Sequence, residues 1–208
     1  AISREAVTPD QIVMAAMGPT GKILMMGEVS PSQVYEAFSE QARAFQEGGA
    51  DAVIIETMTD LEEARQAIKA VQNHTDLEIV CSFTFDRTPG GEFRTMMGLS
   101  PVQVLKELLN MGISIVGTNC GNGLENMIPI VSEMHQTHPD MPILVNANAG
   151  MPIVRQGTVT YPDTPEEMAL QVLPVLEAGA RIIGGCCGTT PRHITAIQQK
   201  VMEFLNPS

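Results

Sequence analysis

The sequence is poor in basic residues and contains no long apolar run. Lys and Arg together number 12 among 208 residues, against 24 Asp and Glu, which gives a formal net charge of −12. This balance argues against a nucleic-acid-binding surface, which needs clustered basic side chains to displace counterions. It also disfavours binding to an anionic membrane, and no apolar stretch approaches the ~20 residues that span a bilayer. We therefore expect a globular protein that binds neither nucleic acid nor membrane.

Cysteine is also scarce, with four residues in the chain. That number is too small for a disulfide scaffold in a sequence of this length. With 14 methionines and no recognisable secretory signal, we expect a cytoplasmic protein. The paired CxxC motifs of structural zinc sites are missing. No Gly-rich nucleotide loop follows the first predicted strand either, which argues against an open dinucleotide-binding sheet.

The sequence does contain a regular alternation of short apolar runs and amphipathic helices. Near-continuous apolar runs are typical of parallel strands that are buried on both faces. We predict strands over Ile12–Met17, Ala52–Ile55, Ile79–Phe83, Ile113–Gly117, Ile143–Ala147 and Ile182–Gly184. Several intervening helices begin with a hydroxyl N-cap, a proline and then Glu or Gln, as at Ser30, Ser100 and Thr164. Pro174 should kink the fifth of these helices.

Six β-α units in succession predict a parallel α/β fold, either an open sheet or a closed barrel. Reactive side chains stand at the carboxyl ends of different strands, which form one face in a (β/α)8 barrel: Glu56, Thr84, Cys120, Asn148 and Cys186. We therefore predict a (β/α)8 TIM barrel formed by a single domain over residues 1–208. A complete barrel has eight units and typically ~250 residues, so we interpret this chain as lacking the first two units. Its open parallel edges should favour association with a second copy.

Three cysteines stand beside glycines at the ends of two predicted strands. Cys186 and Cys187 are adjacent, and Cys120 lies far upstream. Successive side chains on a strand point to opposite faces, so the adjacent pair must lie beyond the strand end to aim at one point. Three thiolates would leave one position of a tetrahedral zinc ion for water or substrate. The alternatives are that the adjacent pair consists of small buried hydrophobic residues, or that it forms a strained vicinal disulfide.

A zinc ion held by three thiolates is a weak Lewis acid, which makes hydrolysis an unfavourable use of the site. Such an ion instead holds a substrate thiol as thiolate at neutral pH, below the ordinary thiol pKa of ~8.5. A thiolate is a nucleophile toward an activated methyl group. The cysteine pattern therefore predicts thiol alkylation. Cys81 is different, because it lies within a predicted strand and is expected to pack in the core.

The same residues resemble a known family. The matching segments are Met17–Thr20, Gly48–Asp51, Ile55–Ala64, Gly117–Cys120, Asn148–Pro152 and Gly184–Pro191. With them the chain resembles the homocysteine-binding, zinc-dependent S-methyltransferase domain of cobalamin-dependent methionine synthase. Betaine– and S-methylmethionine–homocysteine methyltransferases contain the same domain. The family's opening segment, roughly Asp-Gly-Ala-Met-Gly-Thr, has no counterpart here, and the first predicted strand aligns with the family's third.

The resemblance implies a reaction and a set of site residues. A methyl group would pass to the zinc-bound thiolate of homocysteine to form methionine, from methylcobalamin carried by a corrinoid domain or protein. Cys120, Cys186 and Cys187 would be the zinc ligands, and Glu56 would bind the substrate amino group. Asn148 would occupy the fourth zinc position until the substrate thiol displaces it, as in some family members. The residues before it, Asn146 and Ala147, depart from the Tyr- or His-Pro pattern often found there.

Several alternatives remain open at this stage. The methyl donor is alternatively betaine or a sulfonium compound. The chain is alternatively an inactive fragment or subunit whose zinc site needs the missing N-terminal part. As a third possibility, the three cysteines form a purely structural zinc site. A buried Glu56 needs a cationic partner, which is either the substrate ammonium or a Lys or Arg of the protein. Ser82 and Thr84 either donate hydrogen bonds to substrate or satisfy local backbone groups. We expect His193 on the surface of the last helix, and a mobile loop over Asp86–Arg94.

Overall fold

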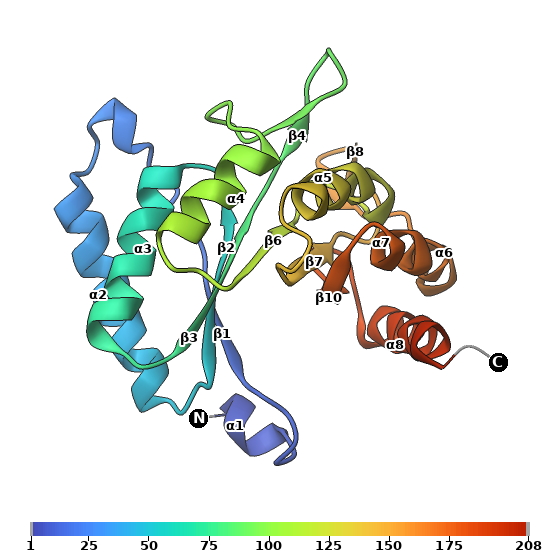
Figure 1. Cartoon of the computed structure of the whole chain (residues 1–208), viewed down its shortest axis with the longest axis horizontal. Coiled ribbons are helices and arrows are strands. Elements are labelled where there is room, and N and C mark those ends of the chain that lie inside the picture. The colour runs from blue at the N-terminus through green and yellow to red at the C-terminus, as the bar shows by residue number, and fades with distance from the viewer. Residues whose placement is uncertain (1, 207–208) are drawn as a thin grey trace.

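The computed structural model describes residues 2–206, and its central element is a six-stranded parallel sheet (Figure 1). The strand order is β1-β2-β3-β6-β7-β10. The strands are β1 (Met14–Met17), β2 (Ala52–Met58), β3 (Glu78–Phe83), β6 (Ile115–Asn119), β7 (Ile143–Ala147) and β10 (Ala180–Gly185). All six runs predicted as strands are confirmed, although their bounds differ by up to three residues. The sheet curls as part of a barrel and remains open, with β1 and β10 at its two edges.

The helices lie on the convex side of the sheet, and all except the last connect successive strands. They are α2 (Pro31–Glu47), α3 (Leu61–His74), α4 (Pro101–Asn110), α5 (Leu124–Thr137), α6 (Pro165–Leu170), α7 (Val172–Glu177) and α8 (Pro191–Leu205). A short α1 (Ile2–Ala6) precedes β1, and a 3-10 turn, η1 (Leu24–Met26), follows it. The predicted capping boxes at Ser30, Ser100 and Thr164 are all formed. Within residues 2–206, no helix combines the length and apolar character needed to cross a membrane.

Pro174 breaks its helix instead of only kinking it. The helix is divided at Gln171 into α6 and α7, because a proline ring collides with the carbonyl four residues earlier, here that of Leu170. The prediction of one kinked helix is therefore wrong, and two short helices stand in its place.

The main core lies between the convex face of the sheet and the helices. Side chains alternate along each strand, so Val53 and Ile55 of β2 face the helices whereas Ile54 faces the concave side. Cys81 is fully buried in the main core, as its position in the strand predicts. A smaller apolar cluster on the concave side contains Ile54, Val80 and Leu144. Both faces are apolar, which explains the continuous runs in the sequence.

Two β-hairpins at the carboxyl side of the sheet are missing from the sequence prediction. The first pairs β4 (Asp86–Arg87) with β5 (Phe93–Arg94) and projects from the end of β3 in Figure 1. The second pairs β8 (Ile153–Arg155) with β9 (Thr158–Thr160) after β7. The segment Asp86–Arg94 is therefore a short hairpin and not an irregular loop, and its mobility stays a prediction. Strands of two or three residues are too short to show an alternating pattern.

Candidate metal and substrate site

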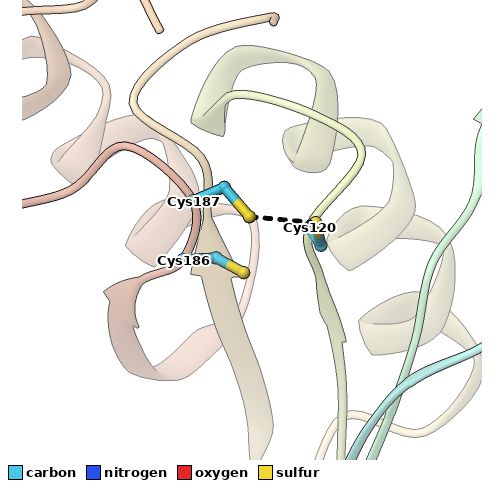
Figure 2. A group of neighbouring side chains, drawn as sticks. All are labelled: Cys120, Cys186 and Cys187. Atoms are coloured by element: carbon cyan, nitrogen blue, oxygen red, sulfur yellow. Dashed lines mark hydrogen bonds between the residues drawn. The ribbon is translucent and has the colours of Figure 1, made fainter. Parts of the chain in front are cut away.

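Three thiols meet at the carboxyl end of the sheet, as Figure 2 shows. Cys120 follows β6, and Cys186 and Cys187 follow β10. Their sulfur atoms all lie within 4.8 Å of one another. The Sγ atoms of Cys120 and Cys187 are 3.8 Å apart. The predicted convergence of distant cysteines is confirmed, and the adjacent pair indeed lies just beyond its strand.

The distance between the sulfur atoms of Cys120 and Cys187 fits two neighbouring ligands of a tetrahedral metal. With metal–sulfur bonds of ~2.3 Å, neighbouring ligands of a tetrahedron are about 3.8 Å apart. The Cys120–Cys187 separation has this value before any adjustment of the side chains. Cys120 and Cys186 are partly buried and Cys187 is exposed, so a further ligand could reach a metal held by the three thiols.

Backbone hydrogen bonds fix the loops that carry the thiols. The Cys186 amide donates to the Ala147 carbonyl at 2.7 Å, and the Cys120 amide donates to the Asn146 carbonyl at 3.0 Å. Both acceptors belong to β7, which lies between β6 and β10. The central strand therefore sets the positions of the thiols on either side of it. Cys120 adopts a left-handed φ of 58°, a strained conformation for a non-glycine residue.

Tight packing explains two of the glycines beside the cysteine pair. A Cβ atom at Gly185 would lie 2.4 Å from Thr189 Oγ1, and one at Gly188 would lie 2.3 Å from Tyr161 Cβ. Gly188 also has a left-handed φ of 80°. Any side chain at these positions would displace the neighbours that shape the loop. The glycines therefore serve the geometry of the thiol site.

The pKa values of Cys120 and Cys186 are shifted in opposite directions. Hydrogen bonding by Cys186, the Gly121 amide, Cys187 and Asn148 lowers the pKa of Cys120 to about 5. The pKa of Cys186 is raised, because its thiol donates to Cys120, is partly buried and faces negative neighbours. Burial alone raises the pKa of Cys81. In the metal-free protein, Cys120 is therefore a thiolate at neutral pH, whereas Cys186 keeps its proton.

This inequality predicts a distinct pH dependence of thiol modification. In the reduced, metal-free chain, Cys120 should be thiolate above a midpoint of about pH 5 and become protonated as the pH falls through it. Iodoacetamide at about pH 6 should therefore modify Cys120 first, because the thiolate is the nucleophile. Mass mapping of the peptides identifies the modified residue, and buried Cys81 serves as the internal control. Modification of all four cysteines at the same rate, and only above about pH 8, would contradict the assignment.

Asn148 lies between the two loops that carry thiols. Its side chain is 1 % exposed, and its Oδ1 accepts a hydrogen bond from the Cys187 amide at 3.1 Å. Its side chain also hydrogen-bonds Cys120, which contributes to the low pKa of that thiol. Asn148 thus contacts both halves of the cluster. Its role as an exchangeable metal ligand remains a prediction.

Glu56 lies near the carboxyl end of β2, close enough to Cys120 for the charge of that thiolate to act on it. Its pKa is raised, first by burial and then by the negative charge of Cys120. Within residues 2–206, no Lys, Arg or His forms an ion pair with this carboxylate. The protein therefore does not supply the cationic partner that a half-buried carboxylate requires. Of the two partners considered for Glu56, a basic side chain of the chain itself is excluded within this range.

Ser82 and Thr84 are engaged by Asn119 rather than pointing to an open cavity. The Ser82 hydroxyl donates to Asn119 Oδ1 at 2.7 Å, and the Thr84 hydroxyl donates to the Asn119 carbonyl at 2.9 Å. Ser82 has no solvent exposure. Their predicted contact with substrate remains a prediction, and in this structure both satisfy polar groups of the protein. Asn119 itself was missed, although it stands directly before Cys120 in the segment Gly117–Cys120.

Two further residues near the site differ from expectation or were overlooked. The Tyr161 phenol hydrogen-bonds Cys187, which raises the pKa of the tyrosine. His193 is 6 % exposed, so its expected place on the surface is wrong. Its Nδ1 accepts from the Thr190 amide at 3.1 Å, which leaves Nε2 to donate to the Asp163 carbonyl at 3.0 Å. His193 thus ties the start of α8 to the segment between β9 and α6, and it is not near enough to the thiols to join their cluster.

Comparison with known proteins supports the resemblance seen in the sequence. The pattern of the Homocysteine S-methyltransferase family matches residues 1–201. Methionine synthase of Mycobacterium leprae is 29 % identical over 96 % of this chain and 17 % of its own length. Methionine synthase of Mycobacterium tuberculosis is 28 % identical over 99 % of the chain and 18 % of its own length. The chain thus spans less than a fifth of these relatives.

The fold has clear neighbours among solved structures. The apo form of the homocysteine methyltransferase MmuM from Escherichia coli matches with a TM-score of 0.73 at 22 % identity, over 96 % of this chain and 66 % of that protein. Its metallated form matches with a TM-score of 0.69 at 23 % identity, over 96 % of the chain and 64 % of that protein. This likeness supports the open sheet as part of a larger barrel. By the match over nearly its full length, the chain belongs to the homocysteine S-methyltransferase family.

Proposed function

We propose that this chain holds zinc through Cys120, Cys186 and Cys187 and transfers a methyl group to the thiol of homocysteine, forming methionine. The observation that carries the proposal is the pairing of a cluster of three thiols with a carboxylate, Glu56, that has no ion pair within residues 2–206. Homocysteine has a thiol for the first and an ammonium group for the second. Membership of the family and the names of its relatives support the same substrate.

Each group of the chain has a defined task in this proposal. Glu56 accepts hydrogen bonds from the substrate ammonium and so orients the thiol toward the cysteines. When bound, zinc supplies a positive centre that keeps a substrate thiol deprotonated at neutral pH. Asn148 hydrogen-bonds two of the cysteines and would be placed to hold the fourth position on zinc until substrate binds. The proton released by the substrate thiol passes to solvent, since the thiol cluster is only partly buried.

For the methyl donor, we propose a methylcorrinoid carried by another domain or protein. Betaine and sulfonium donors are cations, which proteins commonly recognise with aromatic side chains. The chain has no Trp, and Phe83, Phe85 and Phe93 are buried in the core. Within residues 2–206, Tyr161 is the aromatic residue with an interaction at the thiols. The methionine synthase relatives are more than five times longer than the matched region, which leaves room for a donor domain.

A second candidate is that the chain needs a further segment or a second copy before it is active. The observation that favours this candidate is the open sheet, whose β1 and β10 edges have unpaired backbone groups. A barrel of this type closes with eight strands. The zinc site would form in either case, because all three thiols are present on this chain.

Metal analysis with and without homocysteine tests the proposed function. The reduced chain should bind one equivalent of zinc, and X-ray absorption at the zinc edge should reveal three sulfur ligands. Homocysteine should add a fourth sulfur and release one proton. A site that remains unchanged with homocysteine would instead indicate a structural zinc site. A reduced chain that takes up no zinc would overturn the ligand assignment.

A further inference from the structure

The strand that carries Glu56 contains a β-bulge at this residue. Ile55 pairs with Cys81, and Met58 pairs with Phe83, so β2 has one residue more than β3 over this interval. The irregularity therefore lies at Glu56 and Thr57. Bulges interrupt the hydrogen-bond ladder and re-aim side chains, often next to active sites. Thr57 has a left-handed φ of 62°, a rare conformation for a β-branched residue.

Asn119 fills the gap in the ladder that this bulge creates. Its Oδ1 accepts from the Thr57 amide at 2.7 Å, and its Nδ2 donates to Thr57 Oγ1 at 2.8 Å. The same Oδ1 also accepts from the Ser82 hydroxyl. The side chain is fully buried, and these bonds join β6 to β2 and β3. An amide is suited to this place, since it provides an acceptor and a donor at once.

From this geometry we infer that Asn119 is a positioning residue, which holds the bulge at Thr57 and thereby fixes the Glu56 carboxylate relative to the thiol on Cys120. The inference rests on the proposed function, in which Glu56 binds the substrate ammonium. Asn119 stands between the two halves of the site, because its side chain fixes Thr57 and its main chain continues into Cys120. The position of Cys120 does not depend on the Asn119 side chain alone, because the Cys120 amide donates a hydrogen bond to the Asn146 carbonyl.

Substitution of Asn119 should therefore affect recognition of the ammonium group and spare the metal. The readout is the preference for homocysteine over its des-amino analogue, mercaptobutanoate, measured as a ratio of dissociation constants on the zinc-loaded chain. Asn119→Ala should reduce this ratio by about tenfold, because the Glu56 carboxylate is no longer held where it meets the ammonium group. Affinity for zinc and for mercaptobutanoate should stay within a factor of about three of the parent values.

Asn122→Ala is the matched control. Asn122 is also a buried asparagine in the segment after β6, and its Nδ2 donates to the Phe85 carbonyl at 2.7 Å. It has no hydrogen bond to Thr57 or Ser82. This variant should lose thermal stability in the same way as Asn119→Ala and yet retain the homocysteine preference of the parent. Equal loss of preference in both variants would overturn the inference.

Glycine at position 57 provides an independent check on how Asn119 acts. Glycine adopts a left-handed φ without strain, so Thr57→Gly combined with Asn119→Ala should recover part of the lost preference. Asn119→Asp retains the acceptor for the Thr57 amide, and the Thr57 hydroxyl can turn to donate to the second carboxylate oxygen in place of the lost Nδ2 bond. This variant should therefore keep part of the preference even where the alanine variant does not fold. An aspartate variant that is folded but loses the preference would refute the positioning role. If the parent chain shows no preference at all, the proposed function fails instead.

Discussion

Replacing Cys186 with alanine is expected to lower the zinc affinity of the reduced chain by more than about 100-fold, the upper range for losing a partner outside the ligand set. The side chain lies within the cluster whose sulfur atoms are all less than 4.8 Å apart. Loss of this sulfur leaves two thiolates. Cys81 cannot take its place, because Cys81 is buried on the convex side of the sheet. Competition with a chromophoric chelator measures the effect.

Cys81→Ala is the control for this experiment. It removes one sulfur from a well-packed core, which should cost roughly 1 kcal/mol of stability and leave the zinc affinity unchanged. The two variants thus separate a thiol that binds metal from one that packs. Parent-like zinc binding by Cys186→Ala, at one equivalent per chain, would show that this cysteine is not a ligand.

The cysteine site could be predicted because its evidence is local in the sequence. Three thiols beside glycines at strand ends have few other uses, and parallel strands of a curled sheet end on one side. The strands were equally predictable, since sheets buried on both faces require apolar runs. Pro174 was correctly predicted to disturb its helix, but the predicted effect was only a kink. The proline ring collides with the preceding turn and divides the helix in two.

The residues that support the site could not be predicted in the same way. Asn119 acts through Thr57, which is 62 positions away in the sequence, and only a bulge in β2 makes that contact necessary. Tyr161 reaches Cys187 from the loop after β9, a strand that was itself missed. The hydrogen bond between His193 and Thr190 had a weak signal in the sequence, because a hydrogen-bonding residue three positions after an N-cap threonine fits a capping box. Its burial depends on the carbonyl of Asp163, which belongs to another loop.

Replacing Glu56 with glutamine is expected to weaken homocysteine binding to the zinc-loaded chain by about 30-fold, equivalent to about 2 kcal/mol. Glutamine has nearly the same shape and removes only the charge. The carboxylate has no basic partner within residues 2–206, so in the parent its charge is satisfied only when an ammonium group arrives. Calorimetric titration with homocysteine and with mercaptobutanoate measures the change. Affinity for zinc, determined separately, should be unaltered.

The pH dependence of homocysteine binding should change in the same variant. In the parent, the raised pKa of Glu56 means that the carboxylate takes up a proton as the pH falls, at a higher pH than an ordinary glutamate. The protonated form no longer attracts the ammonium group, so homocysteine binding should weaken on acidification more than mercaptobutanoate binding does. With glutamine at position 56 there is no such proton to bind, and the two ligands should show the same pH dependence.

The comparison of two ligands on two proteins isolates the carboxylate–ammonium interaction. Any general loosening of the site by the substitution affects both thiols, because both use the same metal and the same concave surface, and it cancels in the ratio of their affinities. The ratio changes only if Glu56 senses the amino group. A Glu56→Gln variant that weakens both ligands equally would place the carboxylate among the structural residues of the bulge. The ammonium would then have to bind elsewhere.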